Sequence, residues 1–226
     1  MGPGDIAGLA AAARTLGGAV LGPRELARAL GFDPLTVLTS EEQTAVARLP
    51  FDTDALDAAR QEGGMLVLRI PRDPTGPLTM LRLAGRLEGG LDPAVHKGAG
   101  YLLRPEWTID DQPFAAEETC PAGWWLVRRE PLPATLNRTY GEQDAVLRPA
   151  SEDRPSRRSA PEIAFDTLCW QRVHGERLLA ASWDWSRSLS TDQGYAALGE
   201  FRAGGLRVTA YSRPVRFATL GTCPQR

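Results

Sequence analysis

The sequence predicts an α+β protein with N-terminal helices, a mixed middle region, and a C-terminal helix that leads into a small antiparallel β unit. Three observations support this fold class. Alanine- and leucine-rich stretches closed by glycine open the chain, as is typical of short helices. Two apolar, β-prone runs lie in the middle region. From Leu178 to Cys223, short β-prone runs alternate with Gly, Ser, Thr and Asp, which is the pattern of a compact antiparallel unit.

The N-terminal region predicts a series of short helices. We expect them over residues 5–16, 23–30, from the 39–43 segment to Pro50, and from Asp52 or Thr53 to Arg60. Glycine closes the first two, and Pro23 suits a first helical turn because proline lacks an amide hydrogen. Thr39 and Ser40 begin overlapping capping boxes, in which a hydroxyl and an acid or amide three residues later satisfy exposed backbone amides.

The middle region predicts two strands. Met65–Ile70 is apolar and stopped by Pro71, and Trp124–Val127, within a strand expected near 124–130, is followed by prolines that cannot donate to a sheet. Apolar spacing predicts a helix over 78–87, and 139–147 suits another. Residues 91–122 are rich in Pro and Gly, so we expect a long ordered loop there, and its length suggests a role.

The segment 148–160 is polar, mixed in charge and nearly without apolar anchors, so it predicts a linker between regions 1–147 and 161–226. A helix should run from Pro161 to Gly175 and pack on the β unit. The expected strands are 183–185, 195–201, 206–211 and 216–220. Trp183 and Trp185 are two residues apart and so face the same side of their strand, which favours a core position for both.

Composition narrows the classes of function. The chain has 226 residues, a formal net charge of -2 and 42% hydrophobic residues, so a globular fold is expected and broad attraction to nucleic acid is not. Asp5 and Arg14 are inconsistent with a signal peptide, and no apolar run approaches the roughly 20 residues that span a bilayer. Three widely separated cysteines indicate reduced thiols, and hence a cytoplasmic protein without membrane contact.

The strongest catalytic pattern is Cys169 with His174, since a thiol beside an imidazole can form a nucleophile and its base. On a continuous helix, however, a five-residue separation places the two side chains about 140° apart. Cys169 also stands in an apolar setting, where cysteine behaves as a small core residue. His96 is an alternative partner. His174 before Gly175 fits a helix C-terminus, where imidazole interacts favourably with exposed carbonyls.

Cofactor signals are weak. The cysteines and histidines lack the short spacings of structural zinc sites, and the glycine pairs lack the remaining residues of a phosphate-binding loop. We therefore expect neither a metal nor another cofactor.

The C-terminal unit has the side chains that dominate interface hot spots, because Trp, Tyr and Arg gain much contact for little ordering entropy. We expect core positions for the two tryptophans and surface positions for the loop residues. The predicted partner-binding residues are Arg202, Arg207, Tyr211 and Arg213.

Several different short motifs stand along the chain. They are Leu49-Pro50-Phe51, Leu66-Val67-Leu68, Gly123 to Arg128, Gly141-Glu142-Gln143, Gly175 to Leu178, Gly199, Phe201, Gly205 to Val208 and Leu220-Gly221. In this order they resemble a group of uncharacterised bacterial and phage-associated proteins whose Gly- and aromatic-punctuated C-terminal segment differs among copies. The resemblance spans about residues 49–223. It implies a variable C-terminal surface, as in ligand-binding proteins diversified by retroelements, and it supplies no catalytic residues.

The sequence thus predicts a non-enzymatic recognition or assembly protein, of phage or mobile-element origin, that binds a protein or glycan partner through its C-terminal loops. Two alternatives stay open. One is a cysteine-dependent hydrolase or transferase that uses Cys169 with a histidine, and the other is a self-assembling structural subunit.

Overall fold

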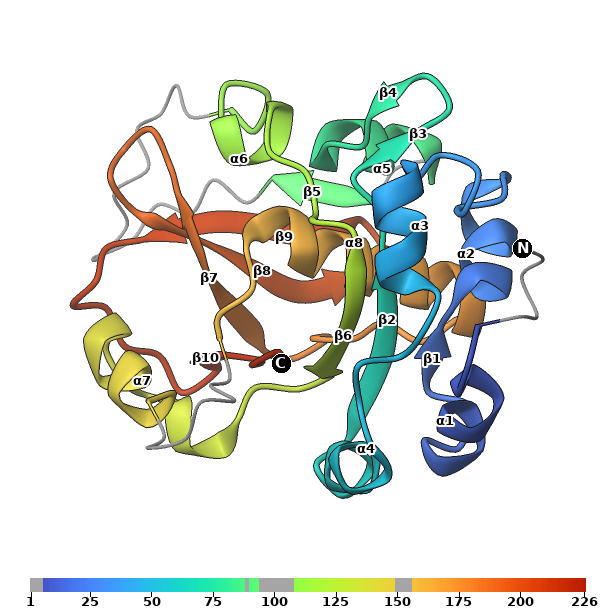
Figure 1. Cartoon of the computed structure of the whole chain (residues 1–226). Helices are drawn as coiled ribbons and strands as arrows, with labels where there is room; N and C mark the ends of the chain where they lie inside the picture. Colours follow the sequence, from blue (N-terminus) through green and yellow to red (C-terminus); the bar gives the residue numbers. More distant parts are fainter. Residues whose placement is uncertain (1–5, 88–89, 94–107, 149–155) are drawn as a thin grey trace.

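The computed structural model describes residues 6–87, 90–93, 108–148 and 156–226, and it has the predicted α+β architecture (Figure 1). The helices are α1 (Leu9–Thr15), α2 (Pro23–Leu30), α3 (Ser40–Val46), α4 (Thr53–Gln61), α5 (Met80–Arg86), α6 (Pro113–Ala116), the 3-10 helix η1 (Pro133–Thr135), α7 (Tyr140–Val146) and α8 (Ala160–His174). The strands are β1 (Val20–Leu21), β2 (Gly64–Arg69), β3 (Arg72–Asp73), β4 (Gly76–Pro77), β5 (Leu91–Pro93), β6 (Gly123–Arg128), β7 (Trp183–Leu189), β8 (Tyr195–Arg202), β9 (Gly205–Tyr211) and β10 (Leu220–Gly221).

Local signals place α1 to α5, α7 and α8 in the regions predicted to be helical, whereas the short α6 lies within residues 91–122, which were expected to be a loop. Thr39 and Thr139 accept hydrogen bonds from the backbone amides three residues later and so cap α3 and α7. Asp52 caps α4 in the same way, and α2 begins at Pro23. Gly31 ends α2 with a φ of 79°, in the left-handed region that glycine adopts without strain.

The two predicted middle strands form one small sheet in the order β1-β2-β6. Strand β2 is antiparallel to β6, with Met65 opposite Val127, and is parallel to β1. The C-terminal residues continue this sheet, because Leu126 and Arg226 exchange backbone hydrogen bonds of 2.9 and 3.0 Å.

The C-terminal sheet has the order β10-β7-β8-β9-β5. Its centre, β7-β8-β9, is antiparallel as predicted. Each edge strand, however, is parallel to its neighbour: β10 to β7 and β5 to β9. The strand expected over 216–220 is reduced to β10, which pairs with β7, because the chain turns back on itself where Leu220 N donates to Phe217 O. The edge strand β5 comes from the region expected to be a loop, of which residues 94–107 lie outside the described part.

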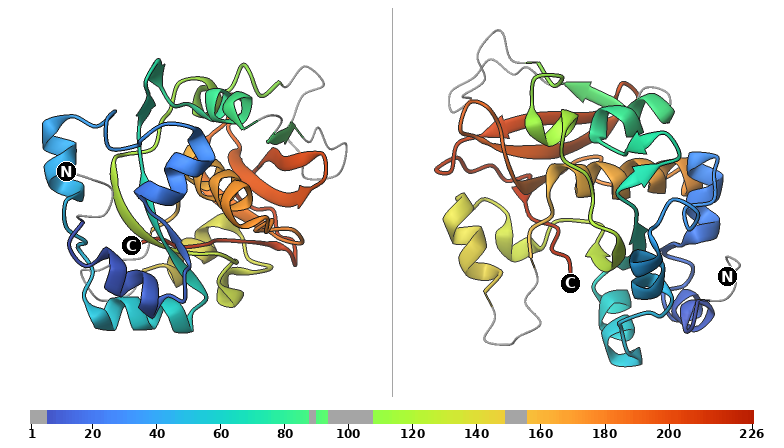
Figure 2. Two further views of the ribbon diagram at one scale, coloured as in Figure 1. Left: turned by 90° about the vertical axis from the view of Figure 1, so that its right-hand side faces the viewer. Right: turned by 45° about the horizontal axis from the view of Figure 1, so that its top comes forward.

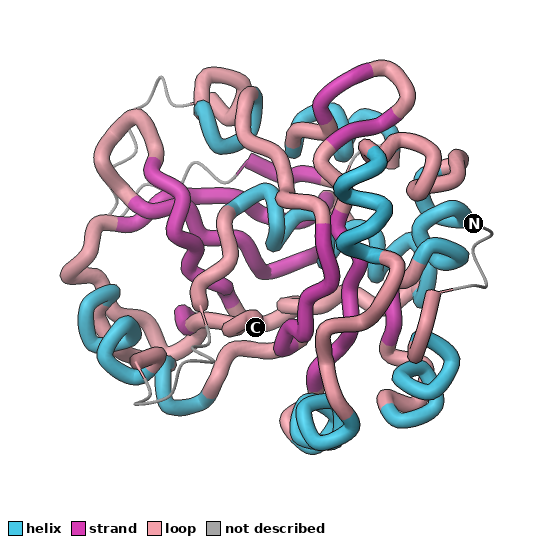
Figure 3. Tube along the Cα trace, in the orientation of Figure 1, coloured by secondary structure: helices cyan, strands magenta, loops and turns pink. Residues whose placement is uncertain are grey.

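Helix α8 lies between the two sheets and contacts β1, β2, β7 and β8 (Figure 2). Its residues from Ala160 to Trp170 are all buried, so it has no solvent-facing stripe along that length. In Figure 3 the strands concentrate around it and the short N-terminal helices lie at one side. A continuous set of buried apolar side chains runs from Ile6 to Cys223 and so joins both predicted regions in one core.

The described part of the predicted linker, residues 156–160, does not behave as a solvated connection. Arg157, Arg158 and Ser159 are buried, whereas residues 149–155 lie outside the described part. For Arg157 and Arg158 the charge reflects internal pairing rather than exposure to water, because both arginines meet carboxylates inside the fold. The expected separation between 1–147 and 161–226 is therefore bridged by shared core contacts.

Candidate functional site at the β7–β8 end of the C-terminal sheet

The four predicted partner-binding residues do not form one surface. Arg202 and Arg207 lie at the β8–β9 turn and both pair with Glu200, at 3.0 and 2.6 Å from its Oε2. Arg213 follows β9 at the opposite end of the sheet. Because Tyr195 and Arg202 are the two ends of β8, strand geometry separates the ends by about 23 Å.

Tyr211 is 2% exposed, so the expectation that it contacts a partner from the surface is wrong. Its ring packs edge-on against Trp183 and Trp185, with centroid separations of 6.2 and 6.3 Å. Both tryptophans are core residues, as predicted. Every residue of β9 except Arg207 is buried, so the strand lacks the alternation that would have identified an outward side.

Arg213 is exposed and lies over two tyrosine rings. Its guanidinium carbon is 5.4 Å from the ring centre of Tyr140 and 5.5 Å from that of Tyr195. The two rings are stacked at 4.0 Å, and Arg157 lies 3.9 Å from the Tyr140 ring. Such cation–π contacts hold a surface arginine in a defined place, each contributing about 0.5–1 kcal/mol. Burial raises the pKa of Tyr140 well above its usual range, so the phenol stays protonated.

Leu189 lies beside this arginine–tyrosine arrangement, because it pairs across the β7–β8 ladder with Tyr195. Among the described residues, Leu189 is the large apolar side chain that is exposed, at 53%. We define the recognition patch as Leu189, Tyr195 and Arg213. Tyrosine and arginine are among the residue types that carry most binding energy at protein surfaces.

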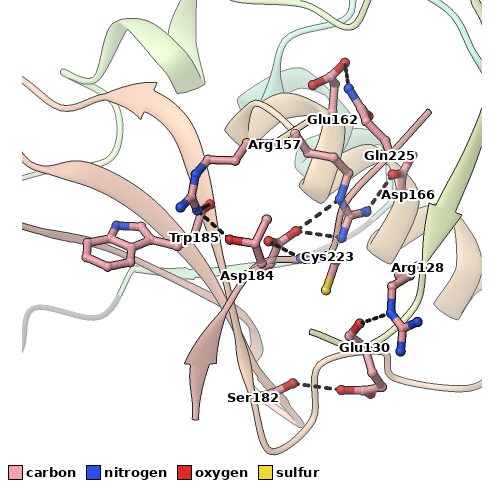
Figure 4. Close-up of polar contacts among 12 residues, drawn as sticks. Arg128, Glu130, Arg157, Glu162, Asp166, Ser182, Asp184, Trp185, Cys223 and Gln225 are labelled. Atoms are coloured by element: carbon pink, nitrogen blue, oxygen red, sulfur yellow. Dashed lines mark hydrogen bonds and ion pairs between the residues drawn. The ribbon is translucent and has the colours of Figure 1, made fainter. Parts of the chain in front are cut away.

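A buried ionic network lies between β7 and α8 (Figure 4). Arg158 donates to Asp184 from Nη2 at 2.7 Å and to Asp166 from Nη1 at 2.6 Å, and Asp184 also accepts from the Cys223 amide at 2.9 Å. Burial alone would lower the pKa of Arg158, but the two carboxylates raise it above its usual value. The guanidinium therefore stays charged inside the protein.

Arg69 is the second centre of the network and is fully buried. It forms a two-point ion pair with Asp166, at 2.8 and 2.5 Å, and donates from Nη1 to Glu162 at 2.9 Å and to Gln225 at 2.6 Å. Burial would raise the pKa of Glu162, but Arg69, the Ser159 amide and other donors lower it below its usual value. Strand β2, helix α8 and the C-terminal segment are thus fastened together.

Arg157 and Arg187 connect this network to the surface. Arg157 pairs with Asp144 at 2.7 Å and donates to the Trp185 carbonyl at 2.8 Å. Arg187 pairs with Glu162 at 3.0 Å, and its side chain is 48% exposed. Arginines 69, 157, 158 and 187 match the carboxylates of residues 144, 162, 166 and 184, so the network is balanced in charge.

A cavity of about 640 Å³ opens next to Leu189. We call it the serine pocket; it is lined by Pro113, Glu118, Thr119, Ser159, Arg187, Ser188, Leu189, Ser190 and Thr191. The β7–β8 turn that forms one wall is fixed by Gln112, whose side chain accepts from the Thr191 amide at 3.0 Å and donates to its hydroxyl at 3.1 Å.

The thiol chemistry that the sequence left open has no support in the geometry. Cys169 is fully buried, and burial raises the pKa of its thiol well above the usual range. His174 is the last residue of α8, as predicted, and its ring stacks on Trp170 at 3.9 Å. His96 lies outside the described residues. Across the described ranges, the His, Cys, Asp and Glu side chains form no group that could hold a metal ion.

Comparisons with protein-family models, with curated proteins and with solved structures gave no match. Within the residues that the structure describes, no helix is long and apolar enough to cross a membrane.

Sequence reasoning selected Arg213 as a partner-binding residue, which stays a prediction, and missed what surrounds it. Tyr140 follows a helix cap and precedes Arg213 by 73 positions, and nothing local to either residue indicates that they meet. Leu189 could have been found, because an apolar residue among serines beside a turn breaks the usual polar pattern of such segments.

Proposed function

We propose that this chain is a non-enzymatic recognition protein that binds a macromolecular partner through the recognition patch. The patch lies at the end of the C-terminal sheet where β7 turns into β8. The observation that carries the proposal is Arg213, which stays exposed while two tyrosine rings hold its guanidinium in place. A partner that meets this arginine gains contacts at little cost in ordering entropy.

The underlying structure supports this use. The tyrosines stand on a strand and a helix rather than on free loops, and Tyr140 is fixed by a backbone hydrogen bond to the Arg213 carbonyl at 3.0 Å. The ionic network ties the start of β7 to α8 through Asp184, and Arg187, two residues before Leu189, pairs with Glu162 of α8. Rigid support of this kind keeps a binding surface preorganised.

The structure adds no support to two parts of the sequence prediction. The origin in a phage or mobile element rests on the sequence resemblance alone and stays a prediction. Enzymatic use of Cys169 is disfavoured, since its buried thiol has a raised pKa and would rarely form the thiolate that attacks a substrate.

The proposal is tested by site-specific photocrosslinking in cells that express the gene. The full chain carries a benzophenone amino acid in place of Leu189, or in place of the exposed Ala203 at the far β8–β9 turn as the matched control. We expect a discrete crosslinked species with the probe at 189 and none at 203. Equal crosslinking at the two positions, or none at 189, would remove the proposal.

A further inference from the structure

We infer that an arginine-lined pocket continues the recognition patch and binds an acidic side chain, so that the partner of the patch is an acidic segment of another protein. The cavity has a volume of about 330 Å³ and lies beside α7. We call it the arginine pocket, because Arg148, Arg157 and Arg187 line it together with Tyr140, Asp144 and Ser156. The inference rests on the proposed function, since it assigns a chemical class to the partner that the patch binds.

The arginine pocket and the recognition patch adjoin each other. Tyr140 lines the pocket, and its ring stacks on Tyr195 of the patch at 4.0 Å. The guanidinium of Arg213 lies 5.4 Å from the centre of the same Tyr140 ring. Arg187 and Leu189 are the two exposed residues of β7, and Arg187 lines the pocket whereas Leu189 belongs to the patch. A partner segment that covers the patch can therefore reach the pocket.

The charges around the pocket leave Arg148 without a counter-charge. Among the described lining residues, Asp144 is the one carboxylate, and Arg157 pairs with it at 2.7 Å. Arg187 pairs with Glu162 at 3.0 Å, and both pairs belong to the network that is balanced in charge. Arg148 is exposed, and no acidic residue in the described part of the chain forms an ion pair with it. An anionic group in the pocket would supply the missing charge.

Arg187 is anchored in place and keeps donors for a ligand. Its Nη1 donates to the Arg157 carbonyl at 2.5 Å, and its Nη2 lies 3.0 Å from Glu162. A guanidinium has more N–H groups than these two contacts use, and the side chain is 48% exposed. Arginine pairs well with carboxylates because two of its N–H groups can meet the two carboxylate oxygens.

Ser156 adds a further donor at the wall of the pocket. Its backbone exchanges hydrogen bonds of 2.8 and 3.0 Å with Gln225, so its position is fixed. The side chain is exposed and carries a hydroxyl that can donate to a carboxylate oxygen. The pocket therefore offers hydrogen-bond donors and positive charge together.

A protein partner fits this site better than a polyanion. The formal net charge of -2 gives the chain no broad attraction to nucleic acid or to an anionic membrane, so an anion must be recognised locally. The serine pocket also contains Arg187, but Glu118 stands in its lining and would repel an anion there. Tyr195 and Arg213 of the adjoining patch belong to residue types enriched at protein–protein interfaces. The ligand of the arginine pocket is therefore a glutamate or aspartate side chain of a polypeptide.

The test is an array of immobilised peptides in which each glutamate-containing sequence has a glutamine counterpart, probed with the labelled full chain. The peptide that binds most tightly is then titrated by fluorescence anisotropy. We expect the glutamine counterpart to bind about tenfold more weakly, because it lacks the charge that Arg148 and Arg187 meet. Added sodium chloride should weaken binding of the glutamate peptide, since salt screens exposed charges.

Two variants of Arg148 grade the effect of charge at an exposed position. Arg148→Ala should weaken the glutamate peptide about 3- to 10-fold, and Arg148→Glu should weaken it further because it repels the ligand. Arg148→Ala should keep the thermal midpoint of the parent, as expected for an exposed side chain outside any ion pair. The matched control is Arg24→Ala at an exposed position of α2, which lies on the opposite side of the molecule from α7 (Figure 1), and it should bind like the parent.

The inference is overturned if no glutamate peptide binds, if the glutamine counterparts bind equally well, or if both Arg148 variants bind like the parent. Binding of an oligonucleotide or of phosphatidylserine vesicles in place of the peptides would also overturn it, because the partner would then belong to another class. Any of these results combined with crosslinking at position 189 would remove the acidic protein segment and leave the recognition patch in place. Loss of the position-189 crosslink would instead remove the proposed function itself.

Discussion

At the scale of single residues, the buried arginines join distant segments of the chain through ion pairs. Arg69 is completely buried, yet its guanidinium meets the carboxylates of Asp166 and Glu162 and the amide oxygen of Gln225. A buried ion pair gains little over an apolar replacement of both partners, but removal of one partner leaves an uncompensated charge. Single substitutions in the network should therefore be severe.

Arg69→Met tests this directly. It leaves Asp166 without its two-point partner, and we expect the free energy of unfolding to fall by about 3–5 kcal/mol. Arg60→Met on the exposed side of α4 is the control, with an expected change within about 0.5 kcal/mol. Urea denaturation measures both. Similar values for the two variants would contradict a structural role for the network.

The stability of the folded protein should depend on pH through Asp73, and the direction of its pKa shift sets the sign of that dependence. Burial would raise its pKa, but hydrogen bonds from Thr75, Arg86 and Arg82 lower it below the ordinary value. A depressed carboxylate pKa adds stability that is fully present above the unfolded-state pKa, about 3.9, and is lost as the pH falls towards the folded-state pKa. The stability difference between the parent and Asp73→Asn should narrow below about pH 4, as measured by urea denaturation. A constant difference would be inconsistent with this linkage.

At the scale of elements, the approach of β8 to β7 depends on Gly199. A Cβ at this position would lie 2.1 Å from the Ser182 carbonyl oxygen and 2.6 Å from the Trp183 Cα, and both are backbone atoms that cannot yield cheaply. The sheet that presents Tyr195 therefore requires glycine here.

Gly199→Ala should reduce the free energy of unfolding by about 3 kcal/mol, because the clash forces the strands apart. The control is Gly141→Ala in α7, where the added Cβ meets nothing within 4 Å. That variant should be more stable by up to about 1 kcal/mol, since alanine is the better helix former. Chemical denaturation checks both, and a neutral Gly199→Ala would show that the strands are not so closely packed.

The helices and the antiparallel strands were predictable because their signals are local. Thr39, Asp52 and Pro23 each mark a helix start within a few residues of sequence. The parallel edge strands could not be predicted. Strand β5 pairs with β9 and β10 pairs with β7, and no local sequence pattern specifies these partners. The same limit applies to the site: Arg213 was identified by residue type, whereas its neighbour Tyr140 comes from a distant helix.

Charge was the main source of error. Arg157 and Arg158 stand in a polar segment that favours a linker, but distant carboxylates of Asp144, Asp166 and Asp184 pair with them inside the fold. Tyr211 was misplaced for a different reason, since β9 is buried on nearly its whole length and hides the alternation that distinguishes inside from outside.

At the scale of the whole molecule, a shared core joins the N-terminal helices to both sheets, and a second, smaller cluster holds Trp183, Trp185 and Tyr211. Helix α8 contacts both sheets, and Arg69 links β2 to α8 and to the C-terminal segment. We expect a single cooperative unfolding transition, with tryptophan fluorescence and far-ultraviolet circular dichroism giving the same midpoint. Two separated transitions, with residues 161–226 unfolding independently, would restore the two-region division that the sequence suggested.

The two ends of the C-terminal sheet also differ in the residues that they expose. One end holds Arg202 and Arg207, which share the carboxylate of Glu200, and the other holds the recognition patch. The most direct measurement is the affinity of Arg213→Ala and Arg202→Ala for the partner captured through position 189. We expect Arg213→Ala to weaken binding about tenfold or more and Arg202→Ala to leave it within about twofold. The reverse order, or equal affinities, would contradict the account.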